Sequence, residues 1–105
     1  MRALINALAL LTAFSTQVLA DAPAPFGYWT TDDGGEELTV SAAGCRFAAN
    51  GMEIAGTCDW NATSAGGVLT ITYPGYTGPQ HIYYNIVWID DRTISVYGDV
   101  FHRRG

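Results

Sequence analysis

Residues 45–58 read CRFAANGMEIAGTC, and this stretch predicts a β-hairpin with a disulfide across it. If Gly51-Met52 forms a two-residue loop with glycine first, the turn is of the II′ type. Counting outward from that loop places Cys45 directly opposite Cys58, so turn chemistry, side-chain alternation and cysteine spacing agree. Three further side chains are expected on the face that carries the sulfurs: Phe47, Ile54 and Trp60.

A competing turn at Asn50-Gly51 shifts this register by two residues and leaves the cysteines diagonal to each other. We favour the first register. Cys45 and Cys58 are the two cysteines of the chain, and in an oxidising compartment each has a single intramolecular partner, so we expect a disulfide. Closing a loop of this length stabilises a fold by about 3 kcal/mol in the chain-entropy model.

The last hairpin of the chain is interpreted in the same way. A II′ loop at residues 98–99 sets Val96 opposite Phe101 and Ile94 opposite Arg103. The apolar side chains of this hairpin then face inward, and Arg103 points toward one end of the fold. An inward arginine needs a partner, because an unpaired buried charge is costly.

Short runs rich in Val, Ile, Thr, Tyr and Trp alternate with glycine and acidic turns, and they predict eight strands. These are Phe26–Thr31, Glu37–Ser41, Cys45–Ala49, Glu53–Trp60, Val68–Tyr73, His81–Ile89, Thr93–Tyr97 and Val100–Arg104. Short connections favour antiparallel neighbours, and closure removes the exposed edges of a meander. We therefore predict an all-β fold, a small eight-stranded antiparallel up-and-down barrel with one disulfide, formed as a single domain by residues 21–105.

An eight-stranded barrel is just wide enough for its own side chains. The side chains expected to fill it are Trp29, Phe47, Ile54, Trp60, Leu69, Ile71, Tyr84, Ile86, Trp88, Ile94, Val96 and Phe101.

Residues 1–20 predict a secretory signal peptide. One basic residue precedes a mostly apolar run, and small or β-branched residues precede a cut expected after Ala20. Polar residues interrupt the run and leave it too short to span roughly 30 Å of hydrocarbon, and no cysteine follows it to carry a lipid anchor. We expect a secreted or periplasmic protein without a membrane anchor.

The predicted mature chain is acidic. Its four Arg, no Lys and ten Asp or Glu give a formal net charge of −6. Such a surface repels nucleic acid and anionic lipid. It favours either simple solubility or a partner with a basic face.

The two ends of the predicted barrel carry a further pattern. Gly27-Tyr28-Trp29 opens the first strand and Arg103 lies on the last, and these strands are neighbours in a closed meander. A guanidinium stacked over an indole is worth about 0.5–2 kcal/mol. With eight strands between its members, this pairing resembles the calycin superfamily of lipocalins, avidins and short secreted inhibitors of bacterial metalloproteases. The resemblance implies a barrel closed by Gly27, Trp29 and Arg103, and a role in binding.

Candidate catalytic and metal-binding residues are sparse. His81 and His102 are the two histidines, and they lack a ligand-spaced third group for zinc. No nucleophile-elbow sequence supports a catalytic triad, so we expect no enzyme activity, no cofactor and no metal site. The acidic run at 32–37 either binds calcium through its carboxylates or forms the solvated tip of a hairpin, and we favour the tip.

The stretch Tyr73–Pro79 predicts a stiff loop with Tyr76 at its tip. Rigid loops that carry tyrosine lose little entropy on docking, although Tyr76 is equally expected to fold back over the barrel mouth as a lid. His81 and Tyr83 continue along the outward face of the next strand.

We expect a binding protein, with another protein as its partner. In the favoured hypothesis, an inhibitor or interaction module, the lead-in with Pro23 and Pro25 and the loop with Tyr76 act together at one barrel end. A carrier of a small ligand is the alternative and predicts a cavity of several hundred Å³. A structural envelope protein with no soluble ligand is the third hypothesis.

Overall fold

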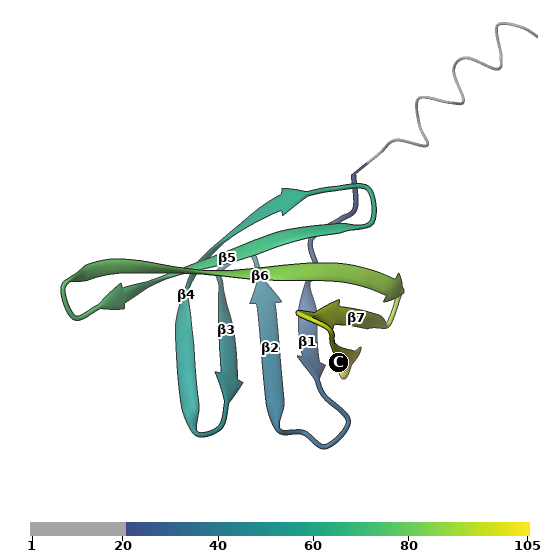
Figure 1. The fold of residues 1–105 in the computed structure, drawn as a ribbon, viewed down its shortest axis with the longest axis horizontal. Coiled ribbons are helices and arrows are strands. Elements are labelled where there is room, and N and C mark those ends of the chain that lie inside the picture. The colour runs from purple at the N-terminus through teal and green to yellow at the C-terminus, as the bar shows by residue number, and fades with distance from the viewer. Residues whose placement is uncertain (1–20) are drawn as a thin grey trace, which may run out of the picture.

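The structure, a computed structural model, describes residues 21–105, whose strands follow one another as a meander. They are β1 (Gly27–Thr30), β2 (Glu36–Ser41), β3 (Gly44–Ala49), β4 (Met52–Ala62), β5 (Gly66–Gly75), β6 (Gly78–Asp90), β7 (Thr93–Val96) and β8 (Asp99–Arg103). All neighbours are antiparallel, and β1 pairs with β8 to close the barrel (Figure 1). The prediction of an all-β, eight-stranded antiparallel barrel is confirmed. The predicted signal peptide at 1–20 lies outside the described residues.

The long β5–β6 hairpin differs from the sequence prediction, which ended β5 at Tyr73 and left a seven-residue loop. The strands instead run on to Gly75 and from Gly78, and Pro74 and Pro79 face each other across them. Pro74 and Pro79 form a non-hydrogen-bonded pair of the antiparallel ladder. Their missing N–H groups therefore cost no hydrogen bond between the strands. The hairpin therefore extends sideways, in a different direction from the β3–β4 hairpin (Figure 1).

The register predicted for the hairpin at residues 45–58 is wrong by two residues. Cys45 faces Gly56, not Cys58, and the turn is Asn50-Gly51. Both turn residues have positive φ, 52° and 78°, which is the I′ geometry that Asn-Gly favours. The disulfide between Cys45 and Cys58 nevertheless forms across the diagonal, over a Cα–Cα distance of 5.6 Å. It is consistent with a periplasmic or extracellular location.

The last hairpin shows the same correction. Its turn is Tyr97-Gly98, with φ of 53° and 89°, so Ile94 faces Phe101 and not Arg103. Tyrosine rarely adopts positive φ, and tertiary contacts hold it there. The Tyr97 hydroxyl donates to the carbonyl of Tyr83, and the Tyr97 ring lies 6.0 Å from that of Tyr84.

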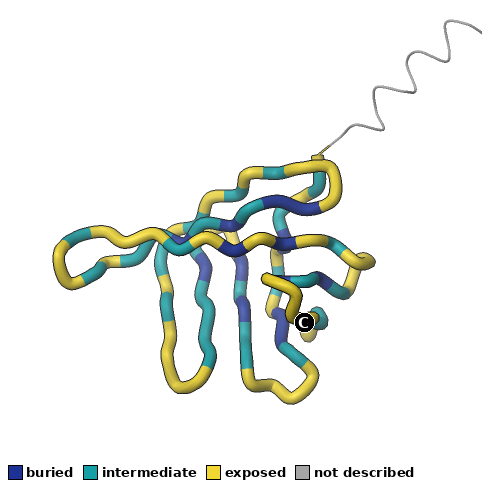
Figure 2. The backbone as a smooth tube through the Cα atoms, in the orientation of Figure 1, coloured by how far each residue is buried: buried dark blue, intermediate teal, exposed yellow. Residues whose placement is uncertain are grey.

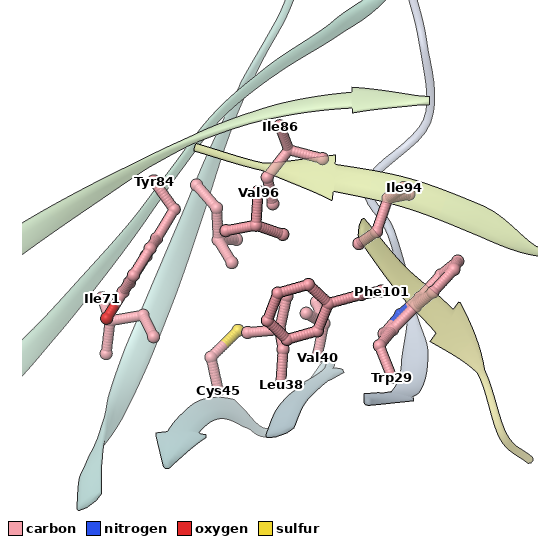
Figure 3. Packing of buried hydrophobic residues seen from close by; sticks show 11 residues of the cluster. Trp29, Leu38, Val40, Cys45, Ile71, Tyr84, Ile86, Ile94, Val96 and Phe101 are labelled. Carbon is pink, nitrogen blue, oxygen red and sulfur yellow. The ribbon is translucent and has the colours of Figure 1, made fainter. Parts of the chain in front are cut away.

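The core fills the barrel where its strands cross (Figures 2 and 3). Every side chain predicted to point inward is buried or packs against the buried cluster, and the sequence prediction missed Leu38 and Val40 on β2. The buried cluster comprises Trp29, Leu38, Val40, Cys45, Leu69, Ile71, Tyr84, Ile86, Ile94, Val96 and Phe101. Residues 21–105 contain no helix with the length and apolarity needed to span a membrane.

The seam between the first and last strands brings Trp29 opposite Arg103. The guanidinium carbon of Arg103 lies 4.4 Å from the centre of the indole. Its Nη1 donates to the carbonyl of Phe26 at 2.6 Å, and Nε and Nη2 donate to the carbonyl of Asp91 at 3.3 and 3.2 Å. Gly27 has φ +132°, and a Cβ there would lie 2.8 Å from Nη1 of Arg103. A side chain at position 27 would therefore displace the arginine.

Candidate functional site

The turns of the barrel alternate between two ends, which differ in how they are covered. We call one the closed end; beside the lead-in, it carries the β2–β3, β4–β5 and β6–β7 turns. We call the other the open end; it carries the β1–β2, β3–β4, β5–β6 and β7–β8 turns.

The lead-in, residues 22–25, is fastened across the closed end by all three tryptophans of the chain. Trp60 Nε1 donates to the carbonyl of Ala22 at 3.1 Å, Trp88 Nε1 to Pro23 at 3.0 Å and Trp29 Nε1 to Pro25 at 2.9 Å. The Trp29 and Trp88 rings also meet edge to face at 5.6 Å. Buried or half-buried indole N–H groups need acceptors, and the lead-in, which pairs with no strand, offers its backbone carbonyls.

This arrangement corrects the predicted binding surface. Pro25 is fully buried under the barrel end, so it is not available to a partner, whereas Pro23 remains exposed. The lead-in is also anchored by its backbone, because the amide of Ala22 donates to the carbonyl of Thr63 at 2.8 Å. The lead-in therefore covers the closed end of the barrel as part of the folded structure.

The lead-in and Tyr76 do not share one end of the barrel, contrary to the favoured hypothesis. Thr63 contacts the lead-in just before β5 begins, whereas Tyr76 follows the last residue of β5. Ten strand residues at about 3.3 Å each separate the two by about 30 Å. Tyr76 is fully exposed and does not fold back as a lid.

The open end holds an apolar hollow, which we call the mouth pocket. Its volume is about 330 Å³. It is lined by Phe47, Ala49, Asn50, Met52, Ile54, Ile82, Tyr84 and Tyr97. These residues come from the β3–β4 hairpin, from β6 and from the β7–β8 turn, so the pocket exists because three separate hairpins converge without filling the space between them.

Tyr84 forms the floor of the mouth pocket. Its ring packs against Phe47 at 4.9 Å, and burial together with the neighbouring Tyr97 and Tyr73 raises its pKa to about 12. Among residues 21–105, its hydroxyl has no hydrogen-bond partner, although the residue is only 5% exposed. A buried hydroxyl without a hydrogen-bond partner is energetically unfavourable.

The wall of the barrel is incomplete beside the mouth pocket. Strand β7 pairs with β6 only from Ile86 to Asp90, so the outer half of β6, from Gly78 to Asn85, has β5 on one side and no strand on the other. In Figure 1 the β5–β6 hairpin turns away from β3 and β4 at this point. We call the stretch Pro79–Tyr83 the free edge of β6.

Carboxylates cluster at the open end. Six of the ten acidic residues lie there, and Arg46 is the arginine that accompanies them, with Nε 2.6 Å from Glu53 and Nη1 3.4 Å from Glu37. The six, which we call the acidic rim, are Asp32, Asp33, Glu36, Glu37, Glu53 and Asp99. Burial and the nearby Asp99 and Asp33 raise the pKa of Glu36, which is the effect expected where like charges crowd.

The acidic β1–β2 loop is ordered by its own hydrogen bonds. Asp33 accepts from the amide of Gly35 and the hydroxyl of Thr31, both at 2.9 Å, and these bonds lower its pKa. Across the described part of the chain, no three His, Cys, Asp or Glu side chains lie close enough to hold a metal ion.

The two histidines lie apart on the outer surface. His81 Nδ1 lies 2.8 Å from Thr72 Oγ1, and His102 Nε2 lies 3.0 Å from Asp32 Oδ1. Tyr83 is exposed on the same face of β6 as His81. Of the predicted binding residues, Tyr76, His81 and Tyr83 thus share the outer half of the β5–β6 hairpin.

The sequence reasoning did not find Met52, Ile82 and Tyr97 as lining residues of a pocket. A signal was present for Met52, which follows the Asn-Gly turn that the first register misplaced. Comparison with protein families, with curated proteins and with solved structures finds no match for this chain.

Proposed function

We propose that this chain is an exported, calycin-like binding protein whose open end holds another protein, as an inhibitor or an interaction module. The signal-like residues 1–20 and the disulfide support export. The pairing of Trp29 with Arg103 supports the calycin resemblance.

The observation that carries the proposal is the apolar mouth pocket beside the free edge of β6. The buried cluster occupies the barrel interior, and the mouth pocket lies beside it at the open end. Its 330 Å³ is at the small end of the roughly 300–1,000 Å³ range of ligand pockets. A space of this kind suits one or two anchoring side chains of a partner, with the exposed hairpin beside it adding contact area.

A carrier of a small apolar ligand is the second candidate, favoured by the same volume and by the apolar side chains that line the pocket. The closed end does not support a free inhibitory arm, because the lead-in is fastened by three indoles.

A pair of matched variants tests the proposal. Met52→Lys places a cation at the mouth, whereas Ile89→Lys places one on the outer face of β6 at the far end; the native side chains are 68% and 54% exposed. The oxidised exported chain is used to capture partners from its native compartment. We expect Met52→Lys to lose a partner that wild type and Ile89→Lys retain. Equal capture by both variants would contradict the proposal.

The neutral fluorophore N-phenylnaphthylamine separates the two candidates. A carrier binds it in the mouth pocket and loses it in Met52→Lys but not in Ile89→Lys. Binding of the fluorophore at micromolar concentration together with no captured protein would favour the carrier.

A further inference from the structure

We infer that the free edge of β6 is a strand-addition site, which takes an extended cationic segment of a partner and seats one of its apolar side chains in the mouth pocket. This inference rests on the proposed function and names the mode of binding and the chemistry of the partner.

The backbone groups of alternate β6 residues point away from β5. The carbonyl of Asn85 accepts from the amide of Tyr97 at 3.1 Å, and the carbonyl of Tyr83 accepts from the Tyr97 hydroxyl. Both therefore point away from β5. Alternate residues of a strand direct their N–H and C=O to the same side, so His81 and Pro79 point that way too.

Most of these outward-pointing backbone groups are unpaired. Within residues 21–105, the amides of His81 and Tyr83 and the carbonyls of Pro79 and His81 have no hydrogen-bond partner. A row of unpaired N–H and C=O groups along a strand edge is a template for pairing with another strand. Lysine side chains often keep an exposed strand edge from pairing with another chain. This edge has none, because the chain contains no lysine.

The mouth pocket lies beside the free edge of β6. Ile82 and Tyr84 lie on the inner face of this half of β6 and line the pocket together with Phe47 and Ile54. In an added strand, the residue opposite Ile82 points to the same face as Ile82. Its side chain would enter the pocket, while its neighbours along the chain point outward. Strand addition with alternate side chains in pockets is an established mode of peptide recognition.

The charge at the open end selects the occupant. In the acidic rim, Glu37 and Glu53 pair with Arg46 and Asp32 pairs with His102, and the predicted mature chain still carries a net charge of −6, which favours a cationic segment. A second copy of this acidic chain is disfavoured for the same reason. The occupant is therefore a basic, extended segment with an apolar residue at every second position.

The test uses a heptapeptide, Lys-Val-Lys-Phe-Lys-Val-Lys, capped at both ends. In the inferred geometry its lysines point outward and their amides face β6, whereas the amides of valine and phenylalanine face solvent. With phenylalanine opposite Ile82 in an antiparallel strand, the last two lysines face the unpaired carbonyls of His81 and Pro79, so N-methylation of these two lysines removes two hydrogen bonds to the edge. N-methylation of the two valines removes none and keeps the same charge and side chains.

We expect N-methylation of the lysines to weaken binding by about tenfold or more, and N-methylation of the valines to weaken it by less than about threefold. Peptide binding should slow amide hydrogen exchange at His81 and Tyr83, with little change at Ile82 and Tyr84, which already pair with β5. The analogue with glutamate in place of lysine should bind more weakly, and the difference should shrink in high salt.

Equal effects of the two methylation patterns, or unchanged exchange at His81 and Tyr83 in the peptide complex, would overturn strand addition. So would protection of these amides in a dimer of the free chain, because a second copy would then occupy the edge. If Met52→Lys still loses its captured partner in those cases, the proposed function stands and this inference alone fails.

Discussion

The guanidinium of Arg103 lies 4.4 Å from the centre of the Trp29 indole, and the two residues face each other across the seam that closes the barrel. The arginine also donates to the carbonyls of Phe26, just before β1, and of Asp91, in the β6–β7 turn. One side chain thus joins β1, β8 and the β6–β7 turn, and the stability of the closure is expected to depend on it.

Arg103→Ala is expected to lower the free energy of unfolding by about 2 kcal/mol, because it removes the indole contact and leaves backbone carbonyls without donors. Urea denaturation followed by tryptophan fluorescence measures this. Arg92→Ala, at the exposed β6–β7 turn, is the control and should change stability by less than about 0.5 kcal/mol. A loss at Arg103 no larger than at Arg92 would show that the contact does not stabilise the seam.

Gly27→Ala is expected to cost about 2 kcal/mol or more, because the new Cβ would meet Arg103 Nη1 at 2.8 Å and φ is +132°. Gly34→Ala is matched in having positive φ, +73°, but has nothing within 4 Å of the new Cβ, so its cost should be about 1 kcal/mol. Thermal and urea unfolding of both variants measure the difference. In the Arg103→Ala background the extra cost of Gly27→Ala should shrink; an unchanged cost would assign it to the backbone alone.

Trp60→Phe and Trp88→Phe each remove one indole donor to the lead-in and are expected to cost about 1 kcal/mol each. The double variant should release the lead-in, which amide exchange at Ala22 reports, since that amide is bonded to Thr63 in the native fold. Tyr28→Phe, an exposed aromatic on β1, is the control and should leave exchange at Ala22 unchanged. Continued protection of the Ala22 amide in the double variant would show that the indoles of Trp60 and Trp88 do not hold the lead-in.

The raised pKa of Tyr84 predicts that the protein loses stability at alkaline pH. Its pKa is raised to about 12 in the folded state, above the value of about 10 for an unfolded tyrosine. The folded state therefore holds the proton more tightly, so the stabilisation is present below pH 10 and is lost as the pH rises from 10 toward 12. Absorbance titration at 295 nm and urea unfolding at each pH measure it. Tyr84→Phe should lack the late-titrating group and show a shallower loss; an identical pH profile would disprove the assignment.

The two glycine turns show where local sequence reasoning was insufficient. At Asn50-Gly51 the correct turn was available from residue type, because asparagine tolerates positive φ. At Tyr97-Gly98 it was not, because tyrosine adopts this conformation only with its hydroxyl bonded to Tyr83 and its ring beside Tyr84. Each of these contacts joins residues more than ten positions apart.

The sequence by itself determined the alternation of inward and outward side chains, and with it the eight strands, the barrel, the disulfide and the meeting of Trp29 with Arg103. These follow from the two-residue period of a strand and from the neighbouring position of the first and last strands in a closed meander. Only the tertiary structure decided that the lead-in plugs one end under three indoles, that Tyr76 lies about 30 Å away, and that half of β6 lacks a neighbour. The physical reason is that these features depend on where long strands stop pairing and on contacts between distant segments, which no local period records.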